Sequence, residues 1–222
     1  MKRFLEQNKI YFEIFASLLF GSAALFVSLA SYHISNQQLA LNSQAQQPHF
    51  SVQTTYVHND GTGKDDDTQL YVSSSSGFAY NLHCQVYSFL DIGLFSGGKR
   101  KDSLVPLIGY YPVSQHTGSS VGTLFVFRGN ANNAHLLGLV DSLKKEQLPP
   151  GETLAEAKLL NLVVIDYLDV TNIGHKAYFL DGEATQEDKA TDYLKAYGAM
   201  LPLDIGKISA KEVLDAAGKP VP

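Results

Sequence analysis

The chain has 222 residues, of which 45% are apolar, so it is long enough for one core of ordinary size plus a short extra segment. Its net charge of −5 leaves no basic surface for a phosphate backbone, which excludes nucleic acid from the expected partners. Cys84 is the only cysteine, which excludes an intramolecular disulfide and a cysteine-rich zinc site.

The first predicted element is an apolar helix over residues 14–34, which carry no formal charge apart from the usually neutral His33. At ~1.5 Å per residue this helix spans the ~30 Å hydrocarbon layer of a bilayer, which predicts a transmembrane helix. A cleaved secretion signal is the alternative, because Ser28-Leu29-Ala30 has the small-x-small form that signal peptidase accepts. A retained anchor is favoured, because the preceding segment is long and carries Glu6 and Glu13.

The charges around this helix predict its orientation. Residues 1–13 contain three basic residues, and none lies between Ser31 and Asp60. The positive-inside rule therefore predicts a cytoplasmic N-terminus at residues 1–13 and an extracytoplasmic C-terminal domain in a single-pass membrane protein.

Small residues recur along the predicted transmembrane helix at intervals of four, three, four and three residues. This spacing keeps them on one stripe, where a second helix can approach closely. The stripe predicts a helix–helix interface in a homo- or hetero-oligomer, with chance as the alternative because small residues are common in membrane helices. The candidate residues are Ser17, Gly21, Ala24, Ser28 and Ser31.

Residues 35–48 form a Gln-rich segment with five Gln, two Asn and no charge. Gln, Ala and Leu are compatible with helix, so the anchor helix is predicted to continue as a stalk until Pro48 stops it. A disordered linker is the alternative.

From residue 49 the period of apolar residues changes to two. Phe50, Val52 and Tyr56 alternate with polar residues, which predicts a strand with one buried face, followed by a polar turn at 58–67. Cys84 lies on the apolar side of a later strand and is predicted to be a buried, unreactive side chain. The further strands are predicted at 69–72, 78–86, 102–111, 122–128, 160–170 and 175–180.

About seven short strands with Gly- and Asn-rich turns between them predict a mainly β protein. The expected fold is an immunoglobulin-like β-sandwich over residues 49–182. The Trp and the paired cysteines of immunoglobulin domains are missing, so this likeness concerns architecture and carries no function with it.

Helical patterns interrupt and follow the strands. Residues 133–147 have apolar residues at helical spacing, although a strand at their start is possible. Thr153 and Glu156 have the spacing of a capping box, which predicts a short helical turn.

Residues 183–222 are predicted to form a C-terminal helical segment. One helix is expected to begin within Thr185–Asp188 and to stop at Gly198. Ser209 and Glu212 form a capping box for a second helix, which Gly218 closes.

No catalytic, cofactor-binding or metal-binding residue is predicted, because the chain contains no known nucleophile, phosphate or zinc motif. Asp65, Asp66 and Asp67 offer oxygen ligands that calcium prefers, but the EF-hand spacing is missing and a solvated loop is the alternative. Asp166 and Asp169 lie an odd number of residues apart on a strand. They are predicted to bond backbone amides at a turn instead of forming an acid–base pair.

These elements predict a membrane-anchored binding or assembly module without catalytic activity, with the bilayer and a protein as its partners and no cofactor. An exported hydrolase with an unrecognised site is one alternative. A pilin-like structural subunit is another, because an apolar helix that leads through a polar stalk into a β domain resembles type IV pilins. Pilins carry a Gly before the mature N-terminal Phe, whereas here Tyr11 precedes Phe12.

Overall fold

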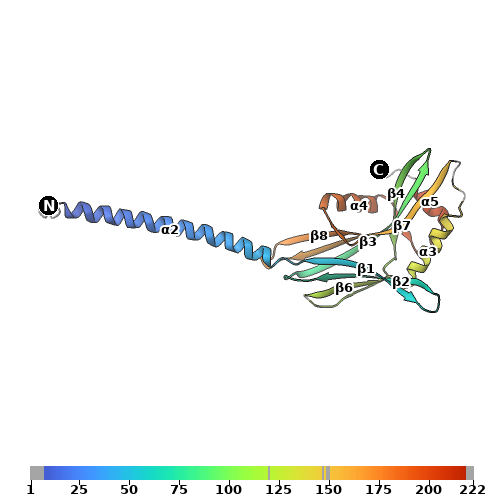
Figure 1. Cartoon of the computed structure of the whole chain (residues 1–222), viewed down its shortest axis with the longest axis horizontal. Coiled ribbons are helices and arrows are strands. Elements are labelled where there is room, and N and C mark those ends of the chain that lie inside the picture. The colour runs from blue at the N-terminus through green and yellow to red at the C-terminus, as the bar shows by residue number, and fades with distance from the viewer. Residues whose placement is uncertain (1–7, 120, 147, 149–150, 219–222) are drawn as a thin grey trace. The chain divides into compact units, whose positions relative to one another are not determined.

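The computed structural model in Figure 1 describes residues 8–119, 121–146, 148 and 151–218. The chain divides into two compact units, Met1–Gln46 and Gln47–Pro222. The described part of the first unit contains one helix, and the second unit contains all the described strands.

The helix of the first unit, α2, comprises Lys9–Ala45. Its segment Lys9–Leu39 is long and apolar enough to cross a membrane, and none of this segment is buried against protein. The helix continues through most of the Gln-rich segment, which confirms the predicted helical extension. Pro48 follows three residues after its end, where a proline prevents further helix.

The second unit is a mainly β domain with short helices. Its strands form a four-stranded sheet in the order β1-β2-β6-β5 and a six-stranded sheet in the order β10-β4-β3-β7-β8-β9. The elements are β1 (Phe50–Asn59), β2 (Lys64–Ser74), β3 (Tyr80–Ser96), β4 (Lys99–Ile108), β5 (Val113–His116), β6 (Gly122–Arg128), α3 (Asn132–Leu143), β7 (Glu152–Leu168), β8 (Gly174–Leu180), β9 (Glu183–Thr185), α4 (Glu187–Ala199), β10 (Leu203–Asp204) and α5 (Ala210–Ala217). The predicted mainly β fold, with an apolar N-terminal helix and short C-terminal helices, is confirmed.

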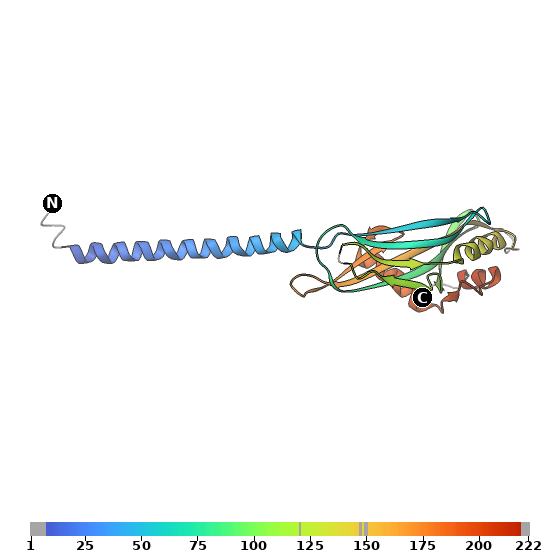
Figure 2. The same cartoon turned by 90° about the horizontal axis from the view of Figure 1, so that it is seen from below.

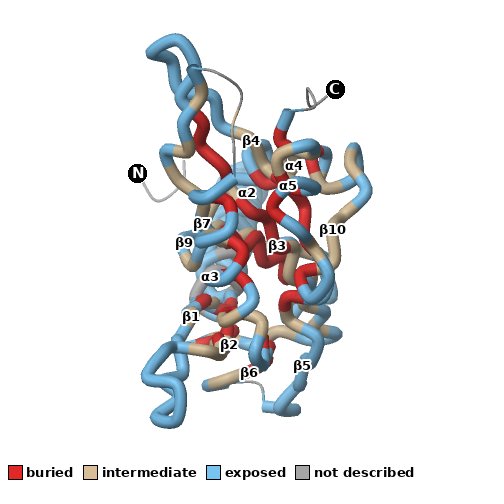
Figure 3. Tube along the Cα trace, turned by 90° about the vertical axis from the view of Figure 1, so that its right-hand side faces the viewer, coloured by how far each residue is buried: buried red, intermediate tan, exposed pale blue. Residues whose placement is uncertain are grey.

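The six-stranded sheet is longer than the four-stranded sheet that packs against it, because β3 and β7 each contain 17 residues. One half of its inner face packs against the four-stranded sheet around Val163 and Ile165. The other half packs against α3 and α5 around Leu90 and Ile92. Figure 2 shows these two helices at one end of the domain, and Figure 3 shows the buried segments in its interior.

Helix α4 covers the outer face of the six-stranded sheet. Phe89 of β3 is fully buried there and makes edge-to-face contacts with Tyr193 and Tyr197 of α4. Ala190 is also fully buried, because only a small side chain fits where the helix meets the sheet. The predicted helix is confirmed, although α4 ends at Ala199 instead of Gly198.

A buried polar network joins α3 to the strands. The hydroxyl of Thr68 donates to Tyr110 Oη over 3.3 Å, and that hydroxyl donates to Asn133 Oδ1 of α3 over 3.4 Å. The Asn133 side-chain amide donates in turn to the Asp65 carbonyl. Each member thus has a partner, as buried polar groups require.

Two local predictions are wrong. Thr153 and Glu156 lie in strand β7, where they pair with β3, so the capping-box spacing does not produce a helical turn. The predicted turn at 58–67 is shorter, because Lys64–Asp67 already belong to β2 and pair with the end of β1. The capping box at Ser209 and Glu212 is confirmed, with both of its hydrogen bonds present.

The strand predicted from Phe78 begins at Tyr80 instead, and its pairing with β7 is interrupted between Tyr80 and His83. Asn81 adopts a φ of 49° at this point, a left-handed conformation that Asn tolerates better than most residues. The alternation of apolar side chains therefore holds only from Leu82 onward.

Candidate functional site

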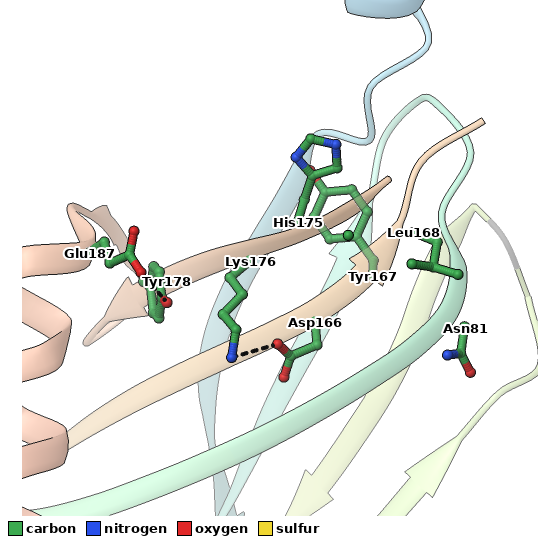
Figure 4. Close-up of a pocket in the computed structure, with 9 residues that line it drawn as sticks. Asn81, Asp166, Tyr167, Leu168, His175, Lys176, Tyr178 and Glu187 are labelled. Atoms are coloured by element: carbon green, nitrogen blue, oxygen red, sulfur yellow. Dashed lines mark hydrogen bonds and ion pairs between the residues drawn. The ribbon is translucent and has the colours of Figure 1, made fainter. Parts of the chain in front are cut away.

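A shallow groove of about 570 Å³ lies over β7 and β8 beside the start of α4 (Figure 4). Lys176 Nζ lies 3.0 Å from Asp166 Oδ1, because the two residues are direct partners across the β7–β8 pair. At the α4 side of the groove, the Tyr178 hydroxyl donates a 3.4 Å hydrogen bond to Glu187 Oε1.

The titratable side chains Lys176 and Tyr178 of this groove each bond to a carboxylate. The hydrogen bond to Asp166 and its charge raise the pKa of Lys176, so the amine stays protonated. Burial, followed by the charge of Glu187, raises the pKa of the Tyr178 phenol. A protonated amine and a neutral phenol beside carboxylates do not form a nucleophile with its base. The groove therefore suits the binding of a polar group better than a covalent step.

His175 lies at the rim of the groove, near the start of β8 and just after the turn between β7 and β8. Its Nε2 lies 2.8 Å from Asp169 Oδ2, while Asp169 Oδ1 accepts hydrogen bonds from Thr171 and from the Ile173 amide. These bonds, the one from the Thr171 hydroxyl foremost, hold the pKa of Asp169 well below its usual range. The prediction that Asp169 bonds backbone amides at a turn is confirmed. For Asp166 that prediction is wrong, because Asp166 lies within β7 and its carboxylate pairs with Lys176.

The free edge of β1 is a second candidate site. β1 has ten residues and pairs with β2 alone, whereas the other edge strands β5, β9 and β10 have four, three and two residues. The start of β1 is covered by the turn between β8 and β9, where a Cβ on Gly182 would lie 3.1 Å from the Val52 carbonyl. Residues Thr55 to Asn59 are all exposed.

This exposed part of β1 carries neither the charged residues nor the prolines that protect many edge strands. Natural edges carry charged residues or prolines that prevent another chain from pairing. β1 contains no Lys, Arg, Asp, Glu or Pro, and its one irregularity is a register shift between Val57 and His58. Tyr56 and Val57 are 58% and 37% exposed, so apolar side chains accompany the free backbone groups.

The five small residues of the predicted helix–helix interface all lie on α2 and are exposed. At about 100° per residue their spacing places them within an arc of about 80°. Ser17 and Ser28 donate their hydroxyls to backbone carbonyls four residues earlier, so both donors are satisfied within the helix. A Cβ on Gly21 would meet no other atom within 4 Å. The single chain therefore presents the stripe, and its role as an interface stays a prediction.

The carboxylates of Asp65, Asp66 and Asp67, beside the β1–β2 turn, already bond to neighbouring groups. Asp65 Oδ1 lies 2.9 Å from His58 Nδ1, and Asp66 Oδ2 accepts a 2.9 Å hydrogen bond from the Asn59 amide. Asp67 accepts from the following backbone amide over 2.7 Å. Among the residues that the structure describes, no group of three His, Cys, Asp or Glu side chains can hold a metal ion. The calcium alternative therefore has no ligand set here.

Cys84 packs against the core between the two sheets. Burial raises the pKa of its thiol to about 12, so the reactive thiolate is not populated at neutral pH. The predicted unreactive character of this cysteine agrees with its position.

Sequence reasoning did not find the groove or the β1 edge. The groove depends on the pairing of Asp166 with Lys176, which lie ten residues apart on different strands. The edge could have been suspected from a predicted strand that carries neither charge nor proline, but its free side depends on which strands pair. Comparisons of the chain with protein-family models, curated proteins and solved structures find no match.

Proposed function

We propose that this protein is a single-pass membrane-anchored binding or assembly module without catalytic activity, and that the β1 edge receives an extended segment of a protein partner. The observation that carries this proposal is that the second half of β1, from Thr55 to Asn59, is exposed and contains no charged residue. An extended segment that adds to a sheet edge gains main-chain hydrogen bonds, while neighbouring side chains provide specificity. Tyr56 and Val57 are the side chains placed to do so.

An immunoglobulin-like sandwich is part of this proposal, and the strand order supports it. The order β1-β2-β6-β5 corresponds to strands A-B-E-D of immunoglobulin domains, and β3-β7-β8 corresponds to C-F-G. In this correspondence β4 is an added strand beside C, and α3 is inserted between E and F. Such an architecture presents edges and loops for binding but does not itself define a partner.

The anchor in this proposal is α2, retained with the N-terminus in the cytoplasm and the β domain outside it. The apolar segment Lys9–Leu39 supports the anchor by its length and composition. The basic residues Lys2, Arg3 and Lys9 support the orientation, because positively charged flanks remain on the cytoplasmic side. The small-residue stripe would bring such anchors together as homo- or hetero-oligomers.

An extended partner segment fits the β1 edge better than a second copy of the chain does. A stable dimer buries roughly 800 Å² on each partner, which is more than a strand of about five residues offers by itself. The remaining edge strands contain two to four residues, so the described domain has no second long edge to complement β1 in a head-to-tail pairing.

The test places a photocrosslinking benzoylphenylalanine at Tyr56 of the full chain in its native membrane. This change keeps an aromatic side chain at an exposed position. A crosslink to another protein is expected from position 56, and none is expected from Val113 on the short edge strand β5, which is 44% exposed. The crosslink is expected to disappear when Thr55→Lys places a charge on the free edge.

Ser51→Lys is the matched control for the Thr55→Lys substitution. Ser51 is exposed on the same strand and points to the same face as Thr55, but it lies in the part of β1 near Gly182. A crosslink that survives Thr55→Lys, or one that joins only copies of this chain, would contradict binding of a partner segment at this edge.

A further inference from the structure

The end of the β domain at which β1 begins is almost free of charge. Three connections meet there: residues 75–79 between β2 and β3, the described residues 117–119 and 121 between β5 and β6, and residues 169–173 between β7 and β8. Their proximity follows from the pairing, since Ser74 pairs with both Phe50 and Gly122, and Leu168 pairs with both Tyr80 and Gly174. We call these three connections the uncharged end.

Apolar side chains are exposed on each connection or directly beside it. Ile173 is 58% exposed, Phe78 50%, Val121 48% and Val170 38%, and Tyr80 at the start of β3 is 54% exposed. Exposed apolar residues on several neighbouring loop tips indicate an interaction surface, because a soluble end would normally carry polar residues there.

Asp169 is the one formally charged residue in the three connections, and it is withdrawn from the surface. Its side chain is only 12% exposed, and its oxygens are occupied by Thr171, Ile173 and His175. The carboxylate keeps its charge, but local hydrogen bonds take the place of most of its contacts with water.

The opposite end of the domain carries charged residues. The β1–β2 turn carries Asp60, the β3–β4 turn is flanked by Lys99 and Arg100, and α3 is followed by Lys145 and Glu146. The domain is thus polarised along its strands, with charge at the end near α3 and exposed apolar side chains at the end where the chain enters.

The chain enters the uncharged end directly from the apolar helix. Only residues 46–49 separate α2 from β1, and no Lys, Arg, Asp or Glu occurs from Ile14 to Asn59. With 37 residues, α2 is ~55 Å long, against ~40–45 Å for a bilayer with its headgroups. A tilt of about 35°, near the upper end of the range of about 0–40° found for membrane helices, shortens its span to about 45 Å. The uncharged end is thus the part of the domain that α2 joins through residues 46–49.

We infer that the uncharged end rests on the lipid bilayer that anchors α2, with Phe78, Val121 and Ile173 in the interfacial layer. The occupant is lipid because the tether supplies it locally and because the surface offers apolar side chains without charge. Contact through apolar side chains does not require anionic lipid, in contrast to polybasic surfaces. The inference rests on the anchoring part of the proposed function and is independent of the β1 edge.

Tryptophan fluorescence tests this contact, because the chain contains no Trp and one introduced residue reports alone. Ile173→Trp is prepared in the full chain and reconstituted into phosphatidylcholine vesicles that contain brominated lipid. A blue-shifted emission and strong quenching by the brominated lipid are expected, unchanged by added salt because no charged contact is involved. Phe78→Trp is the second reporter and keeps an aromatic side chain.

Two controls separate the possible failures. Leu137→Trp, at a 43% exposed position on α3, is expected to emit as in water without quenching. Phe20→Trp within α2 is expected to be quenched if the helix is in the bilayer, as the proposed function requires. Quenching at position 20 without quenching at 173 or 78 would overturn the contact of the loops with lipid while leaving the anchor intact. The same result would be obtained if a protein covered these loops instead. Absence of quenching at position 20 would refute the anchor itself.

Discussion

The two halves of the six-stranded sheet share the strands β3 and β7 but have different covers. One half is covered by the four-stranded sheet, and its core contains Val163 and Ile165. The other half is covered by α3 and α5, and its core contains Leu90 and Ile92. This difference shows how two packed sheets of unequal length can share one core: when strands outgrow the opposite sheet, amphipathic helices cover the remaining apolar surface.

The largest expected effect concerns whether these halves unfold together. Leu124 in the half covered by the four-stranded sheet and Leu143 in the helix-covered half are both fully buried. Each Leu→Ala substitution is expected to lower the free energy of unfolding by about 2–5 kcal/mol, because it removes buried methyl groups and leaves a cavity. Since β3 and β7 run through both halves, denaturant unfolding of the full chain in detergent is expected to show one transition for each variant. A separate early transition in Leu143→Ala alone would mean that the helix-covered half unfolds independently.

The next effect concerns the junction between the halves at Gly129, which follows β6 and precedes α3. A Cβ there would lie 2.6 Å from Thr68 Oγ1, in the polar network with Tyr110. Gly129→Ala is therefore expected to cost about 1–3 kcal/mol through overpacking. Gly138→Ala on the exposed face of α3 is the control, since its Cβ would contact nothing, and it is expected to stabilise the domain by about 0.5–1 kcal/mol. Equal thermal stability of the two variants would disprove the tight packing at the junction.

The half covered by the four-stranded sheet was easier to predict from the sequence than the helix-covered half. The predicted alternation is local and survives in β1 from Phe50 to Thr54, whereas Tyr56 is exposed. The spacing of Thr153 and Glu156 is also local, but these residues pair with β3 at its far end, and that long-range pairing decides their conformation. Local signals therefore succeed where the fold agrees with them and fail where distant strands impose another structure.

The candidate sites were less predictable than the fold. The stripe on α2 follows from helical spacing alone, so its five residues could be identified in advance. The free edge of β1 depends instead on strand order, and the uncharged end depends on which connections meet. Both are properties of the assembled sheets, and one strand read by itself does not contain them.

A smaller effect compares the helices on the two faces of the long sheet. Ser209 caps α5 on the inner face, and its hydroxyl accepts a hydrogen bond from the Glu212 amide. Ser209→Ala is expected to cost about 1 kcal/mol, because it leaves a helix N-terminal donor without its cap. Gln186 at the start of α4 makes no side-chain capping bond, so Gln186→Ala is expected to leave stability unchanged. Chemical denaturation of both variants provides the comparison, and a larger loss for Gln186→Ala would contradict the capping assignment.

The smallest effect concerns the stability at acid pH of the turn between β7 and β8, in the half of the long sheet covered by the four-stranded sheet. Hydrogen bonds hold the pKa of Asp169 below its usual range, so the folded state favours the ionised carboxylate more than the unfolded state does. This contribution is fully present above the unfolded pKa of about 3.9 and is lost as the pH falls towards the lower folded value. Asp169→Asn lacks the titrating group, so the difference in unfolding free energy between the wild type and this variant should stay constant from pH 7 to about pH 5 and shrink below about pH 3.9. The effect is small because the turn lies outside the packed cores. His175 also bonds to Asp169, so a His175→Gln variant separates the contribution of His175 from that of Asp169. A difference that grows on acidification would show that Asp169 is not held in its ionised form by the fold.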